Sequence, residues 1–226
     1  NAMAVGVATE NGTVAIGSHA LYNLAGGAGN TALGYYAGTD ITAGSNNTLV
    51  GKEAGANITD GHQNVVIGAT AGATATGSDE LVLIGYGAGD AINDDAADGT
   101  VAIGYHAAGA LTSGSGNLAI GYQAGQLMTT NGNNTIVGHQ AFIAADSGEA
   151  NNVIIGTSAG SAINTSTSDN NVLIGVNAGT GGGASLAECI AIGKDAMSST
   201  AANTQTGTIA IGKDALTALT SGAGNI

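Results

Sequence analysis

The chain has 226 residues, with 40 glycines, no proline, no tryptophan and one phenylalanine, so large aromatic side chains do not build its core. Three lysines against 16 acids give a net charge of −13, which argues against nucleic acid and anionic lipid as partners because both require clustered cations. No apolar run reaches the roughly 18 residues of a membrane helix, and the single cysteine excludes a disulfide framework and a multi-cysteine zinc site.

The first three residues, Asn1-Ala2-Met3, are typical of an expression scar and carry no fold information. We expect residues 4–226 to form a single repeat solenoid. The chain stops at Asn225-Ile226, where a thirteenth copy of the repeat would begin. We therefore expect this molecule to be part of a longer array.

A short motif, N-L-A-I-G-Y-Q-A-G at residues 117–125, returns along the whole chain. Ile, Leu or Val directly precedes its central glycine, and alanine stands three residues after it in every copy. The glycine recurs twelve times, at spacings of 17 to 19 residues: Gly17, Gly34, Gly51, Gly68, Gly85, Gly104, Gly121, Gly138, Gly156, Gly175, Gly193 and Gly212. In seven copies asparagine stands four residues before it: Asn30, Asn47, Asn64, Asn117, Asn134, Asn152 and Asn171.

The three residues before each glycine are apolar or threonine and predict twelve short strands, at 14–16, 31–33, 48–50, 65–67, 82–84, 101–103, 118–120, 135–137, 153–155, 172–174, 190–192 and 209–211. Seventeen residues are too few for a helical hairpin, and no 3.6-residue period links the apolar positions. Insertions fall between the alanine and the next strand, where loops absorb them. The sequence thus predicts an all-β parallel solenoid of about twelve coils, stacked at about 4.8 Å per coil.

Each repeated residue has an expected role in this stack. Glycine permits a positive-φ turn at the end of each strand, and the alanine suits a place where backbones approach closely. Asparagines at one register form a ladder of side-chain amides. Cys189 replaces an asparagine of that ladder and is expected to pack as a small apolar residue.

The alternation of side chains along a strand gives a prediction about assembly. We expect the residues one and three before each glycine to line the inside of the coil. The residue between them then faces outward, yet it is always apolar, as at Ala15, Leu49 and Ile136. A strand that is apolar on both faces is buried on both faces. With no helix to provide cover, the sequence predicts a homo-oligomer.

The runs N-T-A-L-G-Y-Y-A-G at 30–38 and T-V-A-I-G-Y-H-A at 100–107 resemble two related repeats. One is the head repeat of YadA-like trimeric autotransporter adhesins, and the other is the repeat of many bacteriophage tail fibres. The segments G-S-H-A-L-Y-N at 17–23 and G-S-N-N-T at 44–48 match the second type better. The resemblance implies a left-handed parallel β-roll, a homotrimer, and attachment to a cell surface from an extracellular location.

The expected function is therefore that of a non-enzymatic, structural and adhesive fibre segment without cofactor or metal. The first choice is a phage or virus tail fibre, and the alternative is the head of a bacterial trimeric autotransporter adhesin. Its partners would be its own copies and a host-surface glycan or protein receptor. A further alternative is a glycan-active tailspike-like solenoid, which requires paired carboxylates on one groove.

The position directly after the repeat glycine carries the candidate binding residues, Tyr35, Tyr86, Tyr105, Tyr122 and His139. A row of exposed rings has the chemistry to stack on sugars; alternatively, the rings pack on each other and cover a subunit seam. The same position holds Lys52, Lys194 and Lys213, each followed by an acid.

Two weaker signals remain. Asp90, Asp94, Asp95 and Asp98 offer oxygen ligands for calcium but lack EF-hand spacing, so a solvated loop is the alternative. The run from Gly207 to Asp214 imitates a phosphate-binding loop but ends in an acid where serine or threonine is needed, and is rejected.

Overall fold

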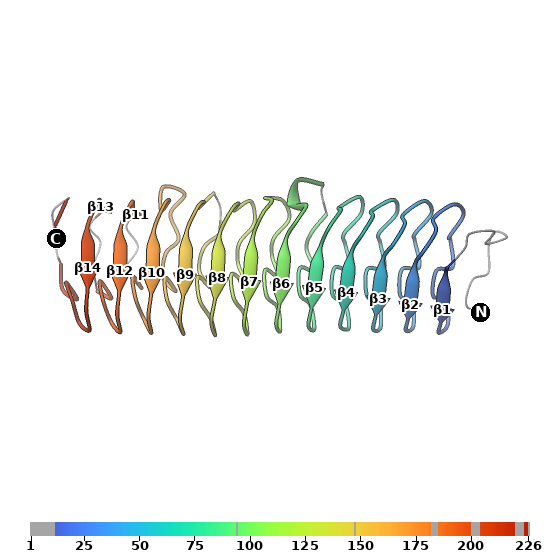
Figure 1. The fold of residues 1–226 in the computed structure, drawn as a ribbon, viewed down its shortest axis with the longest axis horizontal. Coiled ribbons are helices and arrows are strands. Elements are labelled where there is room, and N and C mark those ends of the chain that lie inside the picture. The colour runs from blue at the N-terminus through green and yellow to red at the C-terminus, as the bar shows by residue number, and fades with distance from the viewer. Residues whose placement is uncertain are drawn as a thin grey trace. The chain divides into compact units, whose positions relative to one another are not determined.

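The structure, a computed structural model, describes residues 12–93, 95–146, 148–181, 185–199, 204–219 and 224–225. It is an all-β parallel β-solenoid with about 11 turns, which confirms the predicted fold class. The chain forms two compact units, residues 1–116 and 117–226. In each unit the main strands lie side by side and point the same way (Figure 1).

The first unit contains β1 to β6, in which every strand pairs in parallel with the next one in the sequence. Each pairing joins equivalent positions of neighbouring repeats, as Val14 opposite Thr31. A short 3-10 helix, η1 (Asp95–Ala97), takes up extra residues of the fifth coil. The strands are β1 (Val14–Ile16), β2 (Thr31–Leu33), β3 (Thr48–Val50), β4 (Val65–Ile67), β5 (Val82–Ile84) and β6 (Val101–Ile103).

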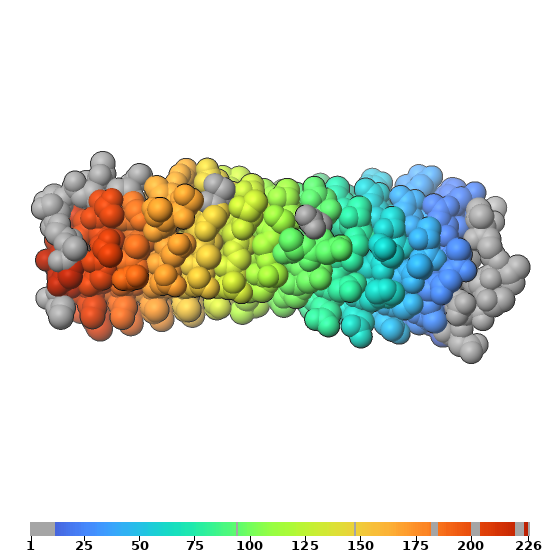
Figure 2. All heavy atoms as spheres, turned by 90° about the horizontal axis from the view of Figure 1, so that it is seen from above, coloured from blue at the N-terminus to red at the C-terminus, as the bar shows by residue number. Residues whose placement is uncertain are grey.

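The second unit continues the pattern, and its coils abut one another in sequence order (Figure 2). The predicted short strand before each of the twelve repeat glycines is confirmed. A second ladder of β11 (Leu186–Ala187) and β13 (Gln205–Thr206) was not expected. The main strands are β7 (Leu118–Ile120), β8 (Thr135–Val137), β9 (Val153–Ile155), β10 (Val172–Ile174), β12 (Ile190–Ile192) and β14 (Ile209–Ile211).

The predicted facing of the strands was wrong. The middle residue of each strand lies inside the coil, and Ala32, Leu49 and Ile136 are fully buried. The residues on either side of it point outward, and Leu33 is 45% exposed and Ile67 37% exposed. The coil is narrow and also receives side chains from its turns, so it has room for one strand side chain per turn. The strands are still apolar on both faces, but the outward face is the one that carries Val, Ile, Leu and Thr.

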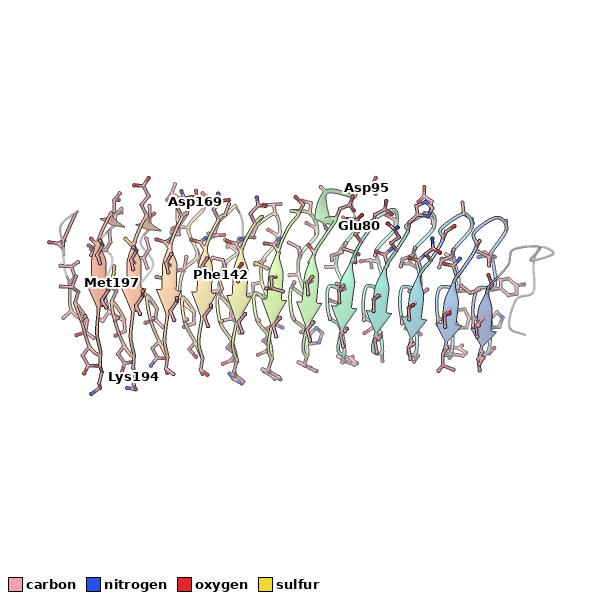
Figure 3. The ribbon with its side chains drawn as sticks, in the orientation of Figure 1. Glu80, Asp95, Phe142, Asp169, Lys194 and Met197 are labelled. Carbon is pink, nitrogen blue, oxygen red and sulfur yellow. The ribbon has the colours of Figure 1, made fainter. Side chains whose placement is uncertain are left out.

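A second interior column comes from the residue seven positions after the repeat glycine. The sequence analysis missed this column because Ala75 and Ala145 interrupt its larger side chains. In the coil with Ala145, Phe142 fills the interior and is fully buried (Figure 3). Leu219 in the last coil is only partly buried, and the other large members of the column are buried: Leu24, Ile41, Ile58, Ile92, Leu111, Met128 and Ile163.

The repeat glycine is required by two constraints at once. Its φ is positive, +148° at Gly34 and +145° at Gly138, as expected for the turn that ends the strand. A Cβ at Gly34 would also lie 2.2 Å from the carbonyl oxygen of Gly51 in the next coil. The glycine therefore permits both the turn and the close stacking of successive turns.

The asparagine ladder is confirmed. The Asn47 side-chain amide donates to Oδ1 of Asn30 at 3.0 Å, and the Asn171 amide donates to Oδ1 of Asn152 at 2.9 Å. Each amide also donates a hydrogen bond to a backbone carbonyl within its own coil; for example, Asn30 Nδ2 donates to the Gly44 carbonyl at 2.7 Å. Cys189 is buried at the same register, as predicted. Its backbone N–H donates to Oδ1 of Asn171 at 2.9 Å and so continues the ladder by one step.

Candidate functional site

Four of the five aromatic residues that follow the repeat glycines form stacked pairs, whereas Tyr35, which is 50% exposed, lies 4.4 Å from Tyr36 at a tilt of 59°. In the first unit, Tyr86 and Tyr105 stack with centroids 5.5 Å apart and planes 13° from parallel. In the second unit, Tyr122 and His139 stack at 5.1 Å and 10°. Tyr86 is 51% exposed. Because each ring covers a face of its neighbour, a ligand beside these pairs meets mainly ring edges and hydroxyls, and a sugar-binding role for them stays a prediction.

The lysines at the same register pair with the acid that follows each of them. Lys52 lies 3.3 Å from Glu53, and Lys213 lies 3.1 Å from Asp214. Lys194 pairs with Asp195, and this hydrogen bond holds the pKa of the Asp195 carboxyl below its usual value. In the second unit Lys194 and Asp169 project from opposite edges of the coils (Figure 3).

A groove of about 630 Å³ crosses the first four coils on the turn side, away from the strands. Three registers form it, at two, five and six residues after the repeat glycine. The groove exists because the side chains five residues after the repeat glycine become small. Tyr22 holds this position in the first coil, and Thr39, Ala56 and Ala73 hold it in the next three. The groove is lined by His19, Tyr22, Asn23, Tyr36, Thr39, Asp40, Glu53, Ala56, Asn57, Ala73 and Thr74.

Aromatic rings gather at one end of this groove. His19 stacks on Tyr36 with centroids 4.6 Å apart and planes 20° from parallel. Tyr22 lies 5.0 Å from His19 at a tilt of 47°. Tyr35 raises the pKa of the Tyr36 hydroxyl by charge repulsion, so the phenol stays a neutral donor. Sequence analysis overlooked these rings because Tyr22 and Tyr36 stand outside the register that follows the glycine.

Polar side chains line most of the rest of the groove, with Ala56 and Ala73 between them. Asn23 Nδ2 donates to Oδ1 of Asp40 at 2.9 Å. Glu53, from a different register, lines the groove as well and faces Lys52 through its ion pair. Two carboxylates thus share one groove, which the sequence spacing of the acids did not predict.

Backbone N–H groups along this groove are already hydrogen-bonded within the coil stack. The N–H groups of Asn23, Asp40 and Asn57 donate to carbonyls of the next coil at 3.0, 3.0 and 3.2 Å. A ligand in the groove is therefore recognised by side chains rather than by addition of a β-strand.

Acidic side chains in the following coils accept hydrogen bonds from backbone N–H groups of the preceding coil. The Asp79 side chain accepts the His62 N–H at 2.6 Å, and the Asp98 side chain accepts the Asp79 N–H at 2.8 Å. These bonds cap backbone groups at a second groove of about 400 Å³, lined by Thr59, Asp60, His62, Thr76, Gly77, Asp79 and Asp95.

The candidate calcium acids do not form a cluster in the described chain. Burial raises the pKa of the Asp90 carboxyl, with His106 opposing the shift. Asp94 lies outside the described residues. Among the residues that are described, no three His, Cys, Asp or Glu side chains are arranged to hold a metal ion.

Comparison with protein families, curated proteins and solved structures gave no match for this chain. No helix in the described part of the chain is long and apolar enough to cross a membrane.

Proposed function

We propose that the chain is a non-enzymatic fibre segment that assembles as a homotrimer and attaches to a host surface, as part of a phage or virus tail fibre. The observation that supports this proposal is the outward strand face. On this face the inner strands expose large apolar side chains, with Leu33 45%, Ile67 37% and Ile155 37% exposed, and no strand in the described part of the chain carries a charged side chain.

The chemistry of this face favours a second copy of the chain as its cover. Parallel sheets are normally covered on both faces, and contiguous exposed apolar surface marks an interaction site. Another copy brings columns of β-branched residues with the same spacing, so the two faces match coil by coil. The net charge of −13 resides outside the strands and does not oppose this contact.

The number of three chains and the attachment role come from the resemblance of the repeats. The same resemblance keeps the head of a bacterial trimeric autotransporter adhesin as the alternative. The complete gene distinguishes the two, since a downstream intramolecular chaperone domain marks a tail fibre and a C-terminal membrane barrel marks an autotransporter.

Light scattering tests the assembly. We expect a particle of three times the chain mass of 21.4 kDa. Ile155→Asp places a charge on the outward face of β9, where the side chain is 37% exposed, and should dissociate the particle. Ser166→Asp in an exposed turn of the same unit is the matched control and should leave the particle intact. A stable folded monomer of the unmodified chain would contradict the proposal.

One observation favours a second candidate, a glycan-active enzyme. Asp40 and Glu53 line the same groove, and glycoside hydrolysis uses two carboxylates. Incubation with host polysaccharide, scored for new reducing ends, tests it. Release that disappears in both Asp40→Asn and Glu53→Gln would replace the non-enzymatic proposal.

A further inference from the structure

We propose that the groove of the first four coils binds a neutral saccharide chain of two to three sugar units. This proposal names a ligand class for the attachment role proposed above and rests on it. It concerns a different surface from the tyrosines that follow the repeat glycines. None of the residues that line the groove belongs to a strand, so subunit packing through the strand faces leaves the groove accessible.

The length of the groove follows from side-chain sizes along one register. Tyr22 ends it, and Thr39, Ala56 and Ala73 leave space over the next three coils. At about 4.8 Å per coil this space is about 14 Å long. That length accommodates two to three pyranose rings in an extended chain.

The lining has the mixture of groups that sugars require. The rings of Tyr22 and Tyr36 offer apolar surface together with polar hydroxyls. Asn23, Asp40 and Asn57 add amide and carboxylate groups along the other rim, where sugar hydroxyls both donate and accept.

The charges select among saccharides. Asp40 and Glu53 are acidic, and the chain contains no arginine to clamp a carboxylate or phosphate. Sialylated or phosphorylated sugars would be repelled, so the groove favours an uncharged chain.

A peptide fits this groove less well. Its floor consists of small side chains rather than a deep apolar hole for an anchoring residue. Its backbone N–H groups at Asn23, Asp40 and Asn57 are already bonded to the next coil.

The test uses saturation-transfer NMR on the whole chain with maltotriose, chitotriose and mannotriose, and with neutral lactose against anionic 3′-sialyllactose to isolate the effect of charge. At least one neutral trisaccharide should bind, and sialyllactose should bind more weakly than lactose. Ala56→Tyr fills the middle of the groove and should weaken binding at least tenfold. Tyr already occupies this register at Tyr22, so the coil tolerates it. Ser161→Tyr, at the same register in the second unit, should leave binding unchanged.

A second variant keeps the test valid if Ala56→Tyr does not fold. Tyr22→Ser should weaken binding severalfold, whereas Tyr122→Ser should not. The proposal is overturned if no neutral trisaccharide binds, if binding survives both groove variants, or if only the anionic sugar binds. A monomer that binds trisaccharide through Tyr22 would refute the trimeric assembly and support the saccharide site. A trimer that binds no trisaccharide would support the assembly and refute the saccharide site.

Discussion

The asparagine ladder gives the sharpest stability prediction, through Asn134→Leu in the second unit. Oδ1 of Asn134 accepts the Asn152 backbone N–H at 3.0 Å, and its Nδ2 donates to the Glu149 carbonyl at 2.9 Å. The substitution removes both of these bonds to the backbone, and also the amide–amide bonds of Asn134 with Asn117 and Asn152. Leucine itself fits the register, because Leu81 occupies the equivalent place in the first unit and is fully buried.

The cost follows from the groups left behind. A buried backbone group without a partner costs about 1–3 kcal/mol, and two such groups give a loss of about 2–6 kcal/mol. The first unit shows how a leucine is otherwise tolerated, because the Thr100 N–H in the coil after Leu81 donates to the Ala97 carbonyl at 3.3 Å. The extra residues of that coil supply this local acceptor.

Urea unfolding at a fixed chain concentration measures the loss, and hydrogen exchange should show faster exchange of the Asn152 amide in the variant. Asn164→Leu, in an exposed loop of the same unit, is the control and should change the free energy of unfolding little. A loss below about 1 kcal/mol for Asn134→Leu, or an equal loss in the control, would refute the role of the ladder.

Three further predictions concern single positions. Gly34→Ala should prevent stable folding, because its Cβ meets the Gly51 carbonyl at 2.2 Å, whereas Gly26→Ala, with nothing within 4 Å, should be neutral in thermal melts. Cys189 should react with a thiol reagent at pH 8 only after unfolding, since burial raises the thiol pKa and disfavours the thiolate. Asp90→Asn should raise the melting temperature at pH 7 and change it little near pH 3. Burial raises the pKa of the Asp90 carboxyl, so ionisation of this group destabilises the folded protein as the pH rises through that pKa. An equal change in melting temperature at both pH values would contradict this cause.

Much of the fold could be predicted because the repeat records its constraints twelve times over. The strand positions, the parallel register, the glycine turn and the Asn30 to Asn47 type of ladder all follow from fixed spacing. Stacking identical coils places equivalent residues side by side, so a spacing in the sequence becomes a contact in space. The outward tyrosines could be predicted for the same reason.

The facing of the strands required the tertiary structure. Because side chains alternate along a strand, the sequence predicts that Leu33 and Ala32 point to opposite sides. Which of the two lies inside depends on the space within the coil, which only the folded structure shows. The interior role of Phe142 follows similarly from the space left by Ala145 within one coil.

The groove also required the tertiary structure, because it depends on side-chain size at three registers at once. Tyr22, Asp40 and Glu53 stand at different offsets in different coils and share no spacing in the sequence. The turn brings these offsets together, and the absence of bulk at Ala56 and Ala73 leaves the space between them. A repeat sequence by itself determines what every coil shares, whereas a site formed by differences between coils becomes visible only when the turns are folded and stacked.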